Sequence, residues 1–164
     1  MTRFGELLGV LGGAGVEFVL IGGVAAVVHG SARSTQNVDI VYRRDRDNYR
    51  RLAGALAPFE PYLRGLPLGL PFRLTEATLA AGLNFTLTTT LGWIDLWGEI
   101  AGWSGYEALE PHSLEVRVFE ITCKVIDLPA LIVAKRAAGR PKDLEVLAEL
   151  ELLLDRRSKD EAAG

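Results

Sequence analysis

The feature that most constrains the fold is an apolar run that ends in two glycines and passes directly into a helical pattern. Residues 17–21 read EFVLI and predict a buried strand, because a short apolar run bounded by glycine is typical of strands. Gly22 and Gly23 follow at once, and residues 23–29, rich in alanine and valine, predict a helix that stops at Gly30. Such a junction leaves backbone N–H groups without helical partners, and phosphate binds well there. An ordinary tight turn is the alternative interpretation.

The remaining pattern predicts strands and helices that are mixed along the chain without strict alternation. Residues 58–71 hold four of the seven prolines, which predicts a loop with a short edge strand at most. We therefore expect an α/β (α+β) fold, a mixed β-sheet flanked by helices, with two C-terminal helices within about 128–157. The other predicted strands are 38–42, 83–89, 93–100, 114–119 and 121–126, and the predicted helices are 4–14, 45–56, 128–138 and 142–156.

Length and composition favour a single soluble domain. The 164 residues are near the common size of one domain, so we expect residues 1–164 to form one. No apolar run approaches the roughly 18 residues that span a bilayer, and the first residues lack the pattern of a secretory signal. The single cysteine, Cys123, excludes an internal disulfide and is expected to be a buried thiol in a strand. We expect a cytoplasmic protein with no membrane partner.

Charge is distributed unevenly, although the net charge is only −3. That total argues against broad, charge-driven binding of nucleic acid. Arginines are concentrated between residues 31 and 73, whereas the part after residue 99 is mostly acidic. The cluster is interpreted either as a basic face for a polyanion or as a solvated surface of mixed charges. Its arginines are Arg33, Arg43, Arg44, Arg46, Arg50, Arg51, Arg64 and Arg73.

Two aspartates, Asp39 and Asp95, lie between apolar neighbours inside predicted strands. A carboxylate in such a place is costly unless it is paired or binds a cation. Convergence of both on Mg²⁺ (or Mn²⁺) explains them together, because Mg²⁺ prefers carboxylate and phosphate oxygens. The alternative, for either aspartate alone, is a strand-end charge satisfied by an arginine. Asn37 faces the same side as Asp39, because side chains alternate along a strand.

These residues occur in a characteristic order. The Gly22-Gly23 pair is followed by HGSARSTQNVD at 29–39, by Asp95 on a later strand, and by KRAAGRPKDL at 135–144. The order resembles the polymerase-β-type nucleotidyltransferase superfamily over about residues 18–147. Within it, the chain is most similar to AbiEii-like toxins and related small bacterial nucleotidyltransferases. Members hold a nucleoside triphosphate (NTP) at the glycine turn and bind two Mg²⁺ ions with a D-x-D pair and a third acidic residue.

The resemblance implies a Mg²⁺-dependent nucleotidyltransferase that moves a nucleoside monophosphate (NMP) from an NTP to a hydroxyl acceptor. The implied acceptor is an RNA 3′ end, such as that of tRNA, or a protein hydroxyl, and the implied protein partner is the antitoxin of a toxin–antitoxin pair. The resemblance implies that Gly22 and Gly23 form the phosphate turn, and that the metal and catalytic positions are Asn37, Asp39 and Asp95. It implies that Lys135 neutralises phosphate charge. The further implied nucleotide contacts are Arg33, Thr35, Arg140, Lys142 and Asp143.

Several of these residues have a plainer interpretation from the chain alone. Lys135 and Arg140 are charges at helix ends, where the dipole favours cations, and Asp143 is placed to open the last helix. Trp97 shares a strand face with Asp95 and is interpreted as a core residue or as a platform for a base. His29 is interpreted as satisfying the end of its helix, or as a residue near the substrate.

Asn37 departs from the family pattern, which has an acidic residue at this position. The shared carboxylate of two-metal chemistry bridges both ions, and an uncharged amide is a poorer bridge. Asn37 therefore marks a weak or one-metal enzyme, a degenerate protein that still binds nucleotide or a partner, or a residue engineered to silence the activity. Glu99, four residues after Asp95 on the predicted strand, is expected to compensate in part.

Overall fold

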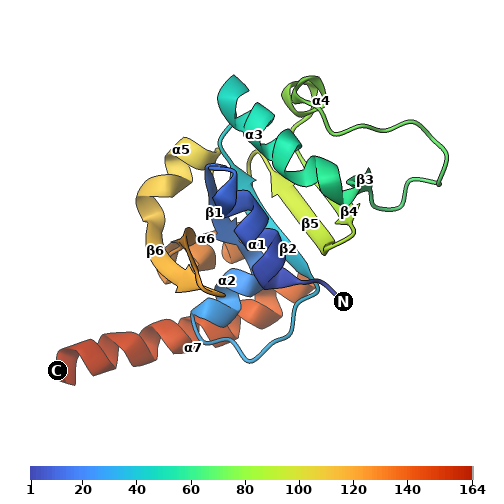
Figure 1. The fold of residues 1–164 in the computed structure, drawn as a ribbon. Coiled ribbons are helices and arrows are strands. Elements are labelled where there is room, and N and C mark those ends of the chain that lie inside the picture. Colours follow the sequence, from blue (N-terminus) through green and yellow to red (C-terminus); the bar gives the residue numbers. More distant parts are fainter. Residues whose placement is uncertain (164) are drawn as a thin grey trace.

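The computed structural model describes residues 1–163, which contain one seven-stranded mixed sheet (Figure 1). Its strand order is β3-β4-β5-β2-β1-β7-β6. The pairs β1–β7 and β2–β5 are parallel, and the other neighbouring pairs are antiparallel. The strands are β1 (Phe18–Ile21), β2 (Asn37–Tyr42), β3 (Tyr62–Leu63), β4 (Phe85–Thr89), β5 (Gly92–Trp97), β6 (Ser113–Val118) and β7 (Ile121–Ile126).

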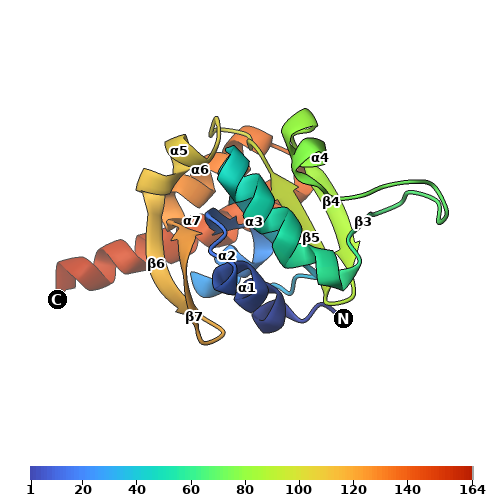
Figure 2. The same cartoon turned by 45° about the horizontal axis from the view of Figure 1, so that its top comes forward.

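Helices cover both faces of the sheet, as the two views of the fold show (Figures 1 and 2). The helices α1 and α3 lie on one face, and α6 and α7 lie on the other. The predicted α/β fold with a mixed sheet, flanking helices and two C-terminal helices is therefore confirmed. The helices are α1 (Phe4–Gly13), α2 (Gly22–Val28), α3 (Arg46–Leu56), α4 (Glu76–Ala81), α5 (Tyr106–Leu109), α6 (Leu128–Ala138) and α7 (Pro141–Ala163), with short 3₁₀ turns η1 (Ala57–Phe59) and η2 (Glu110–His112).

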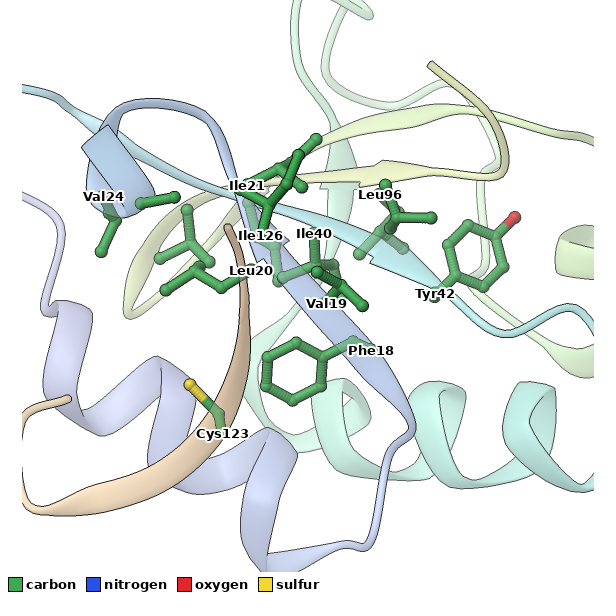
Figure 3. Packing of buried hydrophobic residues seen from close by; sticks show 14 of the residues in the cluster. Phe18, Val19, Leu20, Ile21, Val24, Ile40, Tyr42, Leu96, Cys123 and Ile126 are labelled. Carbon is green, nitrogen blue, oxygen red and sulfur yellow. The ribbon is translucent and has the colours of Figure 1, made fainter. Parts of the chain in front are cut away.

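The central strands are apolar because helices cover both of their faces. All four residues of β1 are buried, and they pack with Ile40 of β2 and Leu96 of β5 (Figure 3). Cys123 is buried in β7, as expected, and burial raises the pKa of its thiol to about 11. Within the described residues, no helix combines the length and apolar character needed to cross a membrane.

Two helices and several element ends differ from the prediction. The helices α4 and α5 were not expected, and both are short; α4 begins where the Thr75 side chain accepts a hydrogen bond from the Thr78 N–H. The helix α7 continues to Ala163, beyond the predicted end at residue 156. The strand β5 ends at Trp97, because the chain then turns, and Glu99 is exposed beyond the strand. The prediction that Glu99 lies on the same strand as Asp95, on the same face, is therefore wrong.

His29 connects three elements and is buried at the C-terminal end of α2. Its Nε2 lies 2.7 Å from the carbonyl oxygen of Ile126, and its Nδ1 lies 3.1 Å from the Arg157 guanidinium on α7. Arg157 also donates to the His29 carbonyl at 3.0 Å, so a distant arginine satisfies this helix end while the ring bridges β7 and α7. A neutral ring fits these contacts, donating from Nε2 and accepting at Nδ1.

This environment predicts acid destabilisation. Burial and the charge of Arg157 lower the pKa of His29 below its usual value, outweighing the hydrogen bond to Ile126. Because the folded pKa lies below the unfolded one, this contribution to stability is present above about pH 6.5 and is lost as the pH falls through the folded pKa. Denaturant unfolding at pH 7.5 and 5.5 should show a smaller loss of unfolding free energy for H29Q than for the parent chain. Equal losses would contradict the role of His29.

Candidate functional site

Strand register brings the two predicted acidic residues together. Asp39 of β2 pairs with Asp95 on the parallel strand β5, and on its other side it pairs with Ile21, the last residue of β1. Directly paired residues of neighbouring strands point to the same face. Asp39 and Asp95 therefore lie side by side at the point where β1 gives way to Gly22.

Gly22 lies against the carboxylate of Asp39. Its φ is +68°, and a Cβ built on it would lie 2.5 Å from Asp39 Oδ2. Only glycine combines this left-handed conformation with such a close approach. At Gly23 a Cβ would lie 2.6 Å from the Thr35 Cβ, so Thr35 covers the second glycine. The structure thus places Gly22, Gly23 and Thr35 beside the acidic pair.

Asn37 joins the two aspartates through its amide nitrogen. The Nδ2 atom donates to Asp95 Oδ2 at 2.9 Å and to Asp39 Oδ1 and Oδ2 at 3.3 and 3.2 Å. The alternation of β2 places Asn37 and Asp39 on one face, as predicted. A donor therefore occupies the position between the two carboxylates, where the resemblance implied a carboxylate.

Arg64, the residue that follows β3, neutralises Asp95. Its Nη2 donates to Asp95 Oδ1 and to the Leu87 carbonyl, at 2.8 Å each. Its guanidinium carbon lies 4.5 Å from the centre of the Trp93 ring, a cation–π arrangement. Asp95 itself is only 7% exposed, so this ion pair is mostly shielded from water.

Among residues 1–163, no Lys or Arg forms a salt bridge with Asp39, and the pKa of this carboxyl group is raised. Burial is the largest cause and raises its pKa; the neighbouring Asp95 also raises it. A hydrogen bond from Trp97 Nε1, 3.1 Å from Oδ1, and the charge of Lys135 act in the opposite direction, and the net pKa is about 7. Without a cation, this carboxyl group is partly protonated near neutral pH.

The C-terminal helices contribute a second charged cluster. Asp143 is 1% exposed and contacts Lys135 Nζ at 3.5 Å and Arg140 Nε at 2.6 Å. It also accepts the Arg140 backbone N–H at 3.2 Å, so it caps the start of α7. Burial opposes its ionisation, but the hydrogen bonds from Arg140 and the two positive charges outweigh burial and lower its pKa. The charge of Lys135 also lowers the pKa of Asp39, which links this cluster electrostatically to the acidic pair.

Two other residues predicted to contact nucleotide, Arg33 and Lys142, form no hydrogen bond with the acidic pair among residues 1–163. Arg33 is half exposed and approaches Glu145 and Glu149 of α7 at 3.9 and 3.8 Å. Lys142 is exposed on α7. Several arginines of the 31–73 stretch are paired in the same way, Arg43 with Glu17 and Arg50 with Asp47 among them, which favours the mixed-charge interpretation over a basic face.

Solved structures share this architecture, although no protein-family model matches the chain and no curated protein matches its sequence. A protein from Thermotoga maritima that is assigned as a nucleotidyltransferase is 15% identical, with a TM-score of 0.58, over 91% of this chain and 94% of its own. The antibiotic-resistance factor ANT(2'')-Ia is 14% identical, with a TM-score of 0.55, over 98% of this chain and 92% of its own. The chain has a nucleotidyltransferase fold.

The carboxylate oxygens of Asp39 and Asp95 are the ligands that this site offers to a divalent cation. Each of the four oxygens of Asp39 and Asp95 already accepts at least one N–H, and one of them is held by Arg64. A carboxylate oxygen keeps a second lone pair for a cation. Among residues 1–163, no group of three or more His, Cys, Asp or Glu side chains is arranged for a metal. The residues that would hold one cation are Asp39 and Asp95.

Sequence reasoning missed two contributors to the site. Arg64 was counted only within the arginine cluster, although pairing with an arginine was the stated alternative for each aspartate. The Trp97 indole packs against the core, as expected for one of its two interpretations, but its N–H reaches Asp39. Nothing in the spacing of the chain pairs Arg64 with Asp95, because they are 31 residues apart.

Gly22 provides a direct test of this geometry. The G22A substitution should lower the free energy of unfolding by about 1–3 kcal/mol, because a left-handed non-glycine residue is strained and its Cβ meets Asp39. Gly54 of α3 is the matched control, since a Cβ there meets nothing within 4 Å. G54A should be neutral or stabilising, as alanine is favoured over glycine in helices. Equal stability of G22A and the parent in urea unfolding would contradict the close approach.

Proposed function

We propose that this chain is a Mg²⁺-dependent nucleotidyltransferase that moves an NMP from an NTP to a hydroxyl acceptor. The observation that carries the proposal is the strand register that sets Asp39 beside Asp95, with Gly22 against the same carboxylate. A glycine turn lets phosphate oxygens approach the backbone, and paired carboxylates hold a cation that binds phosphate. The fold shared with two solved nucleotidyltransferase-type structures supports it.

The proposed residues act by positioning and by charge. The Gly22-Gly23 turn receives the triphosphate, Asp39 and Asp95 hold the cation, and Lys135 adds positive charge from α6. The cation, when bound, offsets the charge of the phosphates. The acceptor oxygen forms a bond to the α-phosphorus as the bond from that phosphorus to the β-phosphate bridge breaks. Pyrophosphate leaves with the electron pair, and the hydroxyl proton passes to Asp95 or to water.

The proposal extends to the biological role, the acceptor and the remaining residues of the site. By its resemblance to AbiEii-like proteins, the chain acts as the toxin of a toxin–antitoxin pair in the cytoplasm, and an RNA 3′ end or a protein hydroxyl is the acceptor. Arg140 and Asp143 form the second wall of the site, where Asp143 orients Lys135 and Arg140. Arg33 and Lys142 contact nucleotide only after leaving their present positions, so we rank them below Thr35.

The N37D substitution tests the reaction. An added carboxylate between Asp39 and Asp95 strengthens the cation site, and losing one electrostatic partner typically costs on the order of 10²–10³ in rate. We therefore expect N37D to transfer label from α-labelled NTPs to total RNA or cell protein about 10²–10³ times faster than the parent. N37D/D39N should lose this gain. No transfer by either chain, with Mg²⁺ or Mn²⁺ and each NTP, would overturn the enzymatic proposal.

A second candidate is a nucleotide-binding protein without transferase activity. The observation that favours it is that Asn37 and Arg64 already satisfy the acidic pair without a cation. It predicts that NTP with Mg²⁺ raises the unfolding free energy by about 2.7 kcal/mol at a hundredfold excess over Kd, with no label transfer. Thermal melting with NTP and Mg²⁺, against NTP and EDTA, measures this effect. An unchanged Tm at millimolar NTP would exclude nucleotide binding altogether.

A further inference from the structure

Arg64 is held at the acidic pair by several independent contacts. Its backbone N–H donates to the carbonyl of Thr86 at 2.9 Å, and Thr86 is the register partner of Asp95 on β4. The sheet edge therefore fixes the main chain of Arg64 beside the site, where the long loop leaves β3 (Figure 1). Its side chain is only 25% exposed, and its Nε is buried without a hydrogen-bond partner. The guanidinium lies where it contacts Asp95 and Trp93, although this position leaves its Nε without a hydrogen bond.

We infer that Arg64 is a built-in counter-ion that takes the place of a second metal ion and limits this site to one divalent cation. This inference rests on the proposed function, because it concerns the same nucleotide and cation site. A guanidinium stays charged at every physiological pH. It therefore supplies one permanent positive charge at Asp95, whatever the metal concentration.

Charge explains why one ion fits and two do not. Two metal ions in such sites lie about 3.5–4 Å apart and need a shared carboxylate to offset their repulsion. Asn37 occupies the bridging position and is uncharged, and its NH₂ group points at both carboxylates. The two carboxylates together with the Arg64 guanidinium leave one net negative charge, which is too little to hold two divalent ions. Among the described residues no salt bridge neutralises Asp39, so its charge is left for the single cation that the two aspartates hold.

The count of bound Mn²⁺ tests the inference without reference to catalysis. Each chain is titrated with Mn²⁺ in the presence of a non-hydrolysable NTP analogue, and the loss of the free-ion EPR signal is corrected for the analogue alone. We expect one Mn²⁺ for the parent and for N37D, because Arg64 is still present in both. We expect two for N37D/R64Q, with the hyperfine pattern of a magnetically coupled pair. Two ions bound by the parent or by N37D would overturn the inference. It would also be overturned if the parent bound no ion, or if N37D/R64Q bound only one.

Arg44 offers a matched control. Its guanidinium also stacks on aromatic rings, those of Tyr42 and Tyr49, and donates to the Leu79 and Gly82 carbonyls, but it contacts no carboxylate. N37D/R44Q should therefore bind one Mn²⁺. If N37D/R64Q does not fold, judged by far-UV circular dichroism and a cooperative melt, N37D/R64M keeps an apolar stem over Trp93 and gives the same count.

The two proposals fail separately. If no label transfer is found but the counts are one, one and two for the parent, N37D and N37D/R64Q, the proposed transferase function fails and the role of Arg64 stands. If transfer is found but N37D binds two ions, the function stands and the role of Arg64 is overturned. Lack of ion binding by all of the chains would contradict both the cation site and the inference.

Discussion

Asp39 and Asp95 are register partners on parallel strands, so two carboxylates lie side by side in the sheet and their charges repel each other. The surroundings of the site follow from this constraint. Arg64 neutralises Asp95, the Asn37 amide donates to both groups, and Trp97 donates to Asp39. The pKa of Asp39 is still raised to about 7, so the internal compensation is incomplete. A single bound cation, as we propose, would complete it.

The backbone is shaped around the same carboxylates. Gly22 adopts a left-handed conformation against Asp39, so the end of β1 lies close to the acidic pair. On α6 and α7, Asp143 holds Lys135 and Arg140. The long helix α7 is joined to the end of α2 by the contact between Arg157 and His29. The placement of these positive charges thus depends on the packing of helices that are distant in sequence.

Local pattern predicted most of the secondary structure, because apolar periodicity reflects which residues a covered sheet must bury. It also predicted that Gly22 and Gly23 end the first strand, and that Asn37 and Asp39 share a face. It missed α4 and α5, which are too short for a helical period to emerge. The local pattern also extended the predicted strand past Trp97, because apolar residues occur as far as Ile100 although β5 no longer pairs with its neighbouring strands there.

By itself, the sequence determined the order of the strands and of the other helices, the glycine turn, and the two aspartates in apolar strands, since each of these depends on neighbours within a few residues. Only the tertiary structure decided that Asp39 and Asp95 are side by side, because strand register depends on packing between segments 56 residues apart. It also decided that Arg64, rather than a nearer arginine, neutralises Asp95. A charge pair across a sheet leaves no periodic trace in the chain, because its energy depends on distance in space and not on separation in sequence.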